Sequence, residues 1–210
     1  MIMPLTPPKI VVATRNAGKL AEIQALLADW SIEWHSLSEF PHAPEAPELA
    51  DTYLENAREK AELIAAHTGC WALADDSGLE VEALGWRPGV RSARFAGDQA
   101  TDEENIRKVL QELKTQPQAG RRAVFRCSIV LQSPEGKERS SEGELWGEIA
   151  DQVLGEKGFG YDPIFFLPER GKTLAQMEPD EKNSLSHRTQ ALLRLRESLS
   201  AHPVWGPTGR

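Results

Sequence analysis

Strand-like and helix-like segments alternate along the whole of this sequence, and that alternation limits the fold more than any other feature. Short apolar runs at 9–14, 31–37 and 71–74 are typical of strands, and apolar residues at helical spacing follow the first of them. The sequence contains no repeat, linker or low-complexity segment. We therefore expect an α/β fold in a single domain over residues 1–210, with a flexible leader at 1–8 and a flexible tail at 200–210.

Two capping boxes mark where internal helices begin. Glu55 follows Thr52 by three residues, and Glu104 follows Thr101 by three. In this pattern the hydroxyl and the carboxylate each satisfy a backbone N–H group of the other's residue. The predicted helices span 52–67 and 101–114, with a last one over 186–199.

Turn-forming residues mark where strands end. The third strand is expected to stop at Asp75-Asp76-Ser77-Gly78, because aspartate, serine and glycine are common in turns. The turn Ser133-Pro134-Glu135-Gly136 lies between strands expected at 122–132 and 139–149, which predicts an antiparallel hairpin. Prolines recur from Pro41 to Pro47 and exclude regular structure from that loop.

The composition excludes several classes of protein. Hydrophobic residues make up 40% of the chain and charged residues 27%, which are globular values. There are 24 Lys and Arg residues against 32 Asp and Glu residues, so the net charge is −8. A general nucleic-acid binder needs the opposite sign, since neutralised phosphates supply most of its non-specific affinity. A small polyanionic ligand fits this charge only where cations gather locally.

The location expected from the sequence is the cytoplasm. Cys70 and Cys127 belong to no CxxC pair, which favours two thiols in a reducing compartment. The first residues lack the basic and apolar regions of a secretory signal. The longest uncharged run, 63–74, is too short and too polar to span a bilayer, so we expect no membrane association.

The first candidate site is the turn Thr14-Arg15-Asn16-Ala17-Gly18-Lys19, between a strand and a helix. Backbone N–H groups at a helix start, with a lysine one turn in, favour an anion. The turn is not a Walker A loop, because the leading glycine is missing and Leu20 replaces the Ser/Thr that binds Mg²⁺. The alternative is an ordinary polar turn with a solvated lysine.

The second candidate site is acidic. Adjacent carboxylates at Asp75 and Asp76 point to different sides, so that one can face a metal while the other supports the backbone. Asn56 and Lys60 share one helix face, and Glu48 precedes that helix and can supply a second carboxylate. The alternatives are an acidic turn and a solvated helix surface.

A third candidate site combines a glycine-rich loop with the start of the last helix. Phe159 lies between two glycines, where a nucleotide base can stack on its ring, and Asp162 can accept hydrogen bonds from a purine. His187 and Arg188 follow Ser186 in the first turn of the helix, where cations need an anionic or carbonyl-bearing partner. The alternative is a loop that only packs its aromatic ring.

Six blocks in this order resemble the inosine/xanthosine triphosphate pyrophosphatase family. They are TRNAGK (14–19), YLENAREKA (53–61), ADDSGLEV (74–81), GVRSARF (89–95), GFGYDPIF (158–165) and SHR (186–188). The resemblance implies an elongated mixed β-sheet with flanking helices that form two lobes around a central nucleotide cleft. It also implies a homodimer, a requirement for Mg²⁺, and hydrolysis of ITP, dITP and XTP to the monophosphate and pyrophosphate.

The resemblance also implies a role for each matching residue. Asp76 is the expected catalytic carboxylate, which binds Mg²⁺ together with Glu48 and activates the water that attacks the α-phosphorus. The residues expected to bind substrate are Thr14, Arg15, Asn16, Ala17, Gly18, Lys19, Lys60, Ser77, Phe159, Gly160, Tyr161, Asp162, Lys182, His187 and Arg188.

We expect the selectivity for the purine base to come from hydrogen-bond donors. Lys182, His187 and Arg188 all donate, which suits a 6-oxo group and rejects the amino group of adenine by roughly 10⁴-fold. The means of rejecting GTP is not visible in the sequence. Three other functions are compatible with the same residues: a pyrophosphatase for other modified nucleotides, a nucleotide sensor without activity, and a sugar-phosphate phosphatase that releases orthophosphate.

Overall fold

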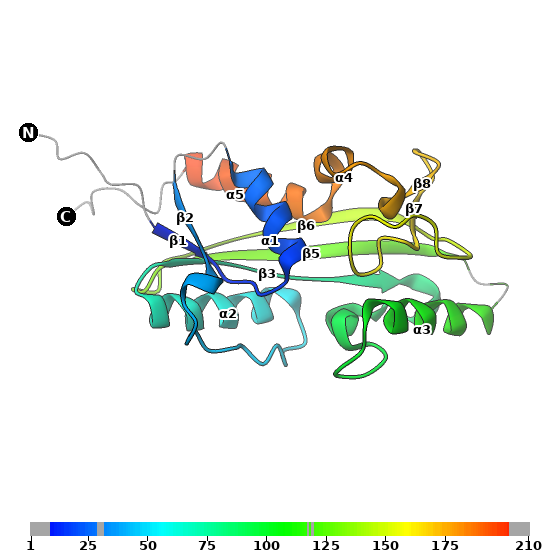
Figure 1. Cartoon of the computed structure of the whole chain (residues 1–210), viewed down its shortest axis with the longest axis horizontal. Coiled ribbons are helices and arrows are strands. Elements are labelled where there is room, and N and C mark those ends of the chain that lie inside the picture. Colours follow the sequence, from blue (N-terminus) through cyan, green and yellow to red (C-terminus); the bar gives the residue numbers. More distant parts are fainter. Residues whose placement is uncertain (1–8, 29–31, 117, 119, 202–210) are drawn as a thin grey trace, which may run out of the picture. The chain divides into compact units, whose positions relative to one another are not determined.

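The computed structural model describes residues 9–28, 32–116, 118 and 120–201, so the predicted leader and most of the predicted tail lie outside the described residues. The strands are β1 (Lys9–Val12), β2 (Glu33–Ser36), β3 (Trp71–Val81), β4 (Arg87–Pro88), β5 (Arg122–Gln132), β6 (Glu138–Ile149), β7 (Phe165–Leu167) and β8 (Lys172–Thr173) (Figure 1). The α-helices are α1 (Ala17–Leu27), α2 (Tyr53–Thr68), α3 (Asp102–Lys114), α4 (Pro179–Leu185) and α5 (His187–Ala201).

The strands pair in a mixed pattern, which confirms the predicted α/β class. Among the described residues the order is β2-β1-β3-β5-β6-β7-β8, with β4 paired to β3. β1 is parallel to both β2 and β3, whereas β4, β7 and β8 join their neighbours antiparallel. The chain divides into two compact units: the first holds Met1–Asp76, Ser128–Glu142 and Ala191–Arg210, and the second holds Ser77–Cys127 and Gly143–Gln190.

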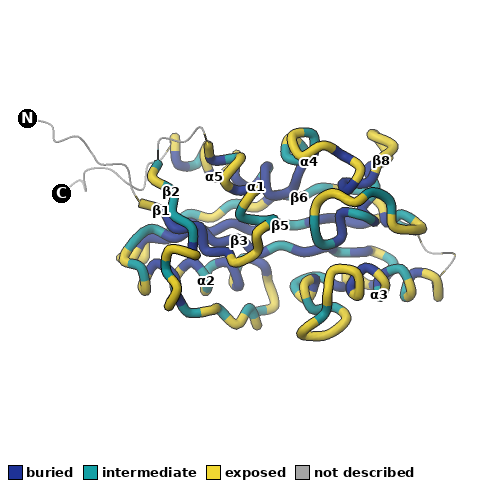
Figure 2. Tube along the Cα trace, in the orientation of Figure 1, coloured by how far each residue is buried: buried dark blue, intermediate teal, exposed yellow. Residues whose placement is uncertain are grey.

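One buried cluster of the first unit, in which α2 packs on β3, is built largely from alanine. α2 presents Ala57 and Ala61 to Ala72 and Ala74 of β3, and all four side chains are buried. Small side chains on both surfaces let the helix approach the strands closely, so polar groups near the helix start come within reach of β3. Figure 1 shows α2 running beneath β1 and β3, and Figure 2 shows these strands as buried.

The buried cluster of the second unit contains larger side chains. Val109 and Leu113 of α3 pack in one cluster with Leu79 and Val81 of β3 and with Phe165 of β7. The same cluster includes Tyr161 and Ile164, which anchors the segment after the glycine-rich loop.

Most of the predicted elements are confirmed. Thr52 caps α2 by accepting a hydrogen bond from the Glu55 N–H group at 3.2 Å, and Thr101 with Glu104 forms a complete capping box at α3. The hairpin turn is closed by the Ser133 N–H group, which donates to the Lys137 carbonyl at 2.9 Å. The proline-rich loop 41–47 contains no strand or α-helix, as expected.

One prediction is wrong: β3 does not end at Ala74 but continues through Asp75-Asp76-Ser77-Gly78 to Val81. Leu79 and Val81 are fully buried and extend the strand, while charged partners from other segments accommodate the two aspartates. Tertiary contacts therefore override the local preference of these residues for a turn. Three strands, β4, β7 and β8, and the helix α4 were not predicted.

Candidate active site

The turn between β1 and α1 is an N-capped helix start. The Asn16 side chain accepts a hydrogen bond from the Lys19 N–H group at 2.9 Å, and the Thr14 hydroxyl accepts one from the Asn16 N–H group at 3.2 Å. Arg15 donates to the Ala43 carbonyl at 2.8 Å and so connects this turn to the proline-rich loop. Ala17, which is exposed, and Gly18, which is half-buried, then begin the first turn of α1. Their N–H groups lie at the positive end of the helix dipole, where an anion binds favourably.

Asp75 and Asp76 point to opposite faces of β3, because successive residues of a strand alternate. The Asp75 carboxylate forms an ion pair with Lys19 of α1 at 3.1 Å. The Asp76 carboxylate accepts a hydrogen bond from Asn56 of α2 at 2.9 Å. Each helix therefore holds one of the two carboxylates.

Asn56 orients Asp76 from a fully buried position. Besides its bond to Asp76, the Asn56 side chain accepts a hydrogen bond from the Ala50 N–H group at 2.9 Å. With both ends of the amide engaged, the side chain has one orientation. The sequence places Asn56 on the correct helix but not in contact with Asp76, because that contact depends on how close α2 comes to β3.

Lys60 lies between the acidic groups of the first unit. Its ammonium group forms an ion pair with Glu48 and donates to the Asp75 carbonyl at 3.0 Å. Glu48 has a φ angle of 48°, a left-handed conformation that is uncommon for a residue with a side chain. Such conformations concentrate at functional sites, where the surrounding structure holds them in place.

The burial of this cluster changes its pKa values. Burial raises the pKa of Asp76, and the Glu48 carboxylate raises it further, whereas Lys19 and Lys60 oppose the rise. Burial alone would lower the pKa of Lys60, but attraction to Asp75, Glu48 and Asp76 raises it overall. Glu48 and Asp76 are thus close enough to repel each other, and Lys60 compensates both charges.

The donor set suits a hard cation with few protein ligands. Within the described residues, no three His, Cys, Asp or Glu side chains are grouped to hold a metal ion. Mg²⁺ differs from most metals here, since it is commonly held by one or two carboxylates together with waters and substrate phosphates. Glu48 and Asp76 are the two carboxylates of this cluster that could hold such a cation.

In the second unit, Asp162 organises the glycine-rich loop. Its Oδ2 atom accepts a hydrogen bond from the Phe159 N–H group at 2.9 Å and forms an ion pair with Lys182 at 2.5 Å. Gly158 has a φ angle of 80°, and a Cβ atom there would lie 2.0 Å from the same oxygen. Glycine is thus required at 158 for both reasons. The sequence predicts that Asp162 accepts hydrogen bonds from a purine, whereas in the structure its carboxylate contacts the loop and Lys182.

Phe159 is half-buried and does not belong to the core cluster of the second unit. The Lys182 ammonium group lies 4.6 Å from the centre of its ring, and the Arg188 guanidinium carbon lies 5.9 Å from it. Arg188 is 1% exposed and donates to the Ser77 hydroxyl at 3.1 Å. An aromatic ring, two cations and a hydroxyl are therefore gathered in one place.

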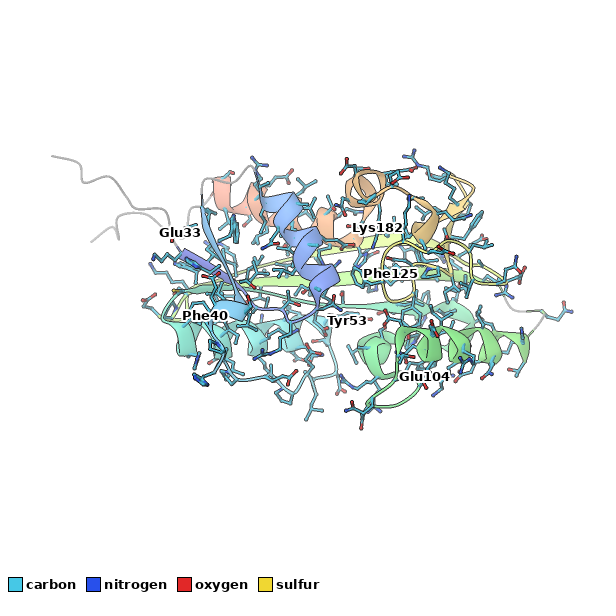
Figure 3. The ribbon with its side chains drawn as sticks, viewed as in Figure 1. Glu33, Phe40, Tyr53, Glu104, Phe125 and Lys182 are labelled. Carbon is cyan, nitrogen blue, oxygen red and sulfur yellow. The ribbon has the colours of Figure 1, made fainter. Side chains whose placement is uncertain are left out.

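His187 and Tyr161 are held by the core of this unit. His187 begins α5, whose first turn is capped by Ser186 accepting from the Thr189 N–H group at 3.1 Å. The imidazole stacks on Phe125 of β5, which is labelled with Lys182 in Figure 3. The Tyr161 ring is buried, its hydroxyl donates to the Ser92 carbonyl at 2.8 Å, and burial raises its pKa. The Tyr161 side chain, which the sequence predicts to bind substrate, is therefore engaged in the core.

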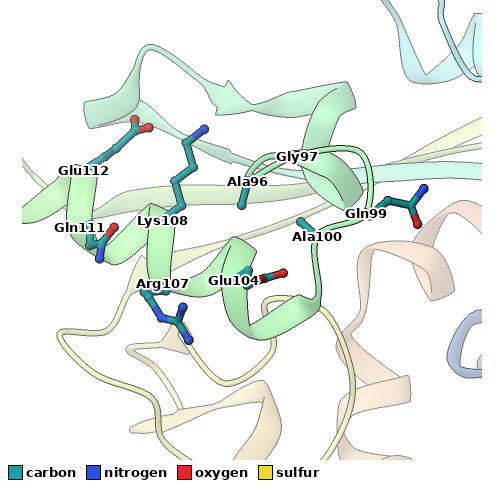
Figure 4. Close-up of a pocket in the computed structure, with 9 residues that line it drawn as sticks. All are labelled: Ala96, Gly97, Gln99, Ala100, Glu104, Arg107, Lys108, Gln111 and Glu112. Carbon is teal, nitrogen blue, oxygen red and sulfur yellow. The ribbon is translucent and has the colours of Figure 1, made fainter.

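An open groove of about 760 Å³ lies elsewhere in the second unit, between the loop 96–100 and α3 (Figure 4). None of the predicted site residues lines it. Its Lys108 donates to the Phe95 carbonyl at 2.7 Å, and its Glu104 completes the capping box of α3. These charged groups already serve the fold, so the groove is not the candidate active site.

The chain was compared with known proteins. A sequence model of the Ham1 family matches residues 10–198. A dITP/XTP pyrophosphatase of Geobacter sulfurreducens is 50% identical over 91% of this chain and 96% of its own length. One from Geobacillus kaustophilus is 48% identical, over 90% of this chain and 93% of that protein. The structure of a HAM1 protein from Coxiella burnetii superposes with a TM-score of 0.84 at 44% identity, and covers 92% of this chain and 99% of that one.

Proposed function

The chain belongs to the Ham1 family, and on that premise we propose that it hydrolyses dITP, ITP and XTP to the nucleoside monophosphate and pyrophosphate. The relatives named dITP/XTP pyrophosphatase support the substrate class. The observation that carries the proposal for this chain is the pair Asp75 and Asp76, each held by a different helix beside a lysine. That arrangement gathers cations for phosphate groups around a buried carboxylate.

The first unit supplies the phosphate chemistry. The N–H groups at the start of α1, together with Lys19 and Lys60, neutralise the negative charge of the triphosphate. Asp76, oriented by Asn56, accepts a proton from the attacking water or holds that water toward the α-phosphorus. Most of the catalysis then comes from positioning and charge neutralisation, as is usual in phosphoryl transfer.

Mg²⁺ is part of the proposal. Glu48 and Asp76 would hold the ion, which neutralises phosphate charge when bound. Glu48→Gln removes one ligand charge while Lys60 keeps its other partners. We expect the Mg²⁺ concentration for half-maximal activity to rise about tenfold. Unchanged Mg²⁺ dependence would remove Glu48 from the metal site.

The second unit supplies base recognition. Phe159 offers a stacking surface, and Lys182 and Arg188 bring donors beside it. His187, the residue before Arg188 in α5, adds a third donor. A 6-oxo purine accepts hydrogen bonds from such donors, whereas the amino group of adenine leaves them unpaired.

The location of the protein and its oligomeric state complete the proposal. None of the described helices combines the length and apolar character needed to cross a membrane. Both cysteines are free thiols, in keeping with the cytoplasmic location that we propose. We also propose a homodimer, as the family resemblance implies.

Product analysis tests the function directly. Purified protein with Mg²⁺ is given ITP, dITP, XTP, GTP or ATP, and pyrophosphate and orthophosphate are measured separately. Pyrophosphate from the deaminated purines is the expected result. Orthophosphate would indicate a phosphatase, binding without product would indicate a sensor, and equal rates on ATP would refute the assigned selectivity.

A further inference from the structure

The Phe159 ring depends on a backbone that is held at two successive N–H groups. The Phe159 N–H group donates to Asp162 within the loop at 2.9 Å, and the next one, at Gly160, donates to Asp102 of α3 at 2.6 Å. Gly160 has a φ angle of 59°, a left-handed backbone conformation that residues with a side chain adopt only with strain. The backbone on both sides of the Phe159 Cα atom is thus bonded to a carboxylate.

Asp102 is not needed to cap its own helix. The capping box formed by Thr101 and Glu104 already occupies the start of α3: the Thr101 hydroxyl accepts from the Glu104 N–H group at 3.2 Å, and the Glu104 carboxylate accepts from the Thr101 N–H group at 2.8 Å. The Asp102 carboxylate is therefore available for the loop, 58 residues away in sequence.

The helix that carries Asp102 is fixed in the second unit. Val109 and Leu113 are buried in the core, and the buried Asn105 side chain donates to the Ala93 carbonyl at 3.1 Å and accepts from the Ala96 N–H group at 2.8 Å. Asp102 thus reaches the loop from a rigid support. The loop itself contains three glycines between 155 and 160, which leave it many conformations unless it is held.

We propose that Asp102 is a positioning residue of the base-binding site: by accepting the Gly160 N–H group, it fixes the backbone that carries the Phe159 ring. This inference rests on the proposed function, because it assigns Phe159 to the base. Asp102 touches neither base nor phosphate in this role. Its loss should weaken the binding of every purine substrate alike and leave the chemical step unchanged.

The test compares three variants with the wild-type enzyme on dITP. Asp102→Ala removes the acceptor, Asp102→Asn retains a side-chain oxygen, and Glu103→Ala removes a neighbouring carboxylate for which no bond to the loop is found. We expect Asp102→Ala to raise KM about tenfold with kcat within about twofold, and Asp102→Asn to restore most of the loss. Glu103→Ala should match the wild type.

Hydrogen exchange of the 155–163 segment, measured without nucleotide, gives a second readout. The Gly160 amide should exchange about tenfold faster in Asp102→Ala than in Glu103→Ala. Equal exchange in the two variants would overturn the proposal, and so would faster exchange with unchanged KM. If the wild-type protein does not hydrolyse dITP, the proposed function fails, and exchange alone decides whether Asp102 holds the loop.

Discussion

The His187 imidazole lies flat against the Phe125 ring, with the ring centres 4.8 Å apart and the planes 10° apart. Phe125 is itself packed against Phe165 at 4.5 Å. A ring stacked on a supported ring keeps its plane, so the directions of the two imidazole nitrogens are set by residues of the core. The ring of His187, which we propose to recognise the base, is therefore oriented by residues of β5 and β7.

Phe125→Leu should reduce selectivity as well as stability. The smaller side chain removes the stacking surface, and we expect the ratio of kcat/KM for dITP over dATP to fall about tenfold. Stability should fall by about 1–3 kcal/mol. Phe165→Leu is the comparison variant: Phe165 is fully buried and its described ring contact is with Phe125 rather than with the imidazole, so we expect a similar loss of stability and a smaller loss of selectivity. Equal selectivity in the two variants would refute the orienting role.

Asp76→Asn should abolish turnover while increasing stability in the absence of divalent cations. The pKa of Asp76 is raised in the folded protein, mainly by burial, so the folded state holds its proton more tightly than the unfolded state. The free energy of unfolding therefore falls as the pH rises through the folded-state pKa of Asp76, and this loss persists at neutral pH. Asparagine does not ionise, and Lys19 and Lys60 keep Asp75 and Glu48 as partners.

Thermal unfolding in EDTA at several pH values checks this effect. The advantage of Asp76→Asn should be present at pH 7 and shrink as acid protonates the wild-type carboxyl group. A lower unfolding temperature for Asp76→Asn at pH 7 would contradict the argument.

Lys60→Gln should lower kcat by about 100-fold, because a group that stabilises developing charge in a water-poor site contributes strongly to the rate. The substitution also leaves Glu48 and the Asp75 carbonyl without the ammonium group that joins them. Lys137→Gln, in the exposed hairpin turn, is the control and should keep full activity. Steady-state kinetics with dITP measures both, and a Lys60→Gln enzyme with normal kcat would exclude the proposed role.

Gly158→Ala should damage the base site far more than Gly136→Ala damages the hairpin. The two glycines have φ angles of 80° and 84°, so alanine costs about 1–2 kcal/mol of backbone strain at either position. Only at 158 does the new Cβ atom meet another group, the Asp162 oxygen. We expect a KM for dITP raised at least about tenfold for Gly158→Ala and an unchanged KM for Gly136→Ala, although both lose stability.

The parts of this structure that the sequence predicts are those governed by local rules. Thr52 and Thr101 cap their helices because a hydroxyl and a carboxylate three residues apart suffice for a helix start. The extension of β3 through Asp75 and Asp76 has no such local cause, since it depends on Lys19, 56 residues earlier in the chain, and on the α2 residues opposite. Burial of aspartate in a strand is unfavourable until those partners are in place.

The same distinction between local and long-range causes applies to the residues of the candidate site. The sequence motifs identify the residues around Asp76 and those around Phe159 as candidate site residues, but they give no role to Asp102. That residue lies in no matching block, and its only visible property in the sequence is an acidic charge near a helix start, where aspartate is common for other reasons. Its contact with Gly160 becomes visible only when α3 and the loop are seen together.

Because Asp75 and Asp76 face opposite sides of β3, the strand is sensitive to a change in its length as well as to the size of its side chains. Deleting or inserting one residue between Trp71 and Asp75 would rotate the rest of the strand by half a turn and move each of the two carboxylates to the opposite face. An insertion would place Asp75 in the present position of Asp76, beside Asn56, and a deletion would place Asp76 in the present position of Asp75, beside Lys19. A frame change of one residue in this strand would therefore remove each carboxylate from its present partner in a single step.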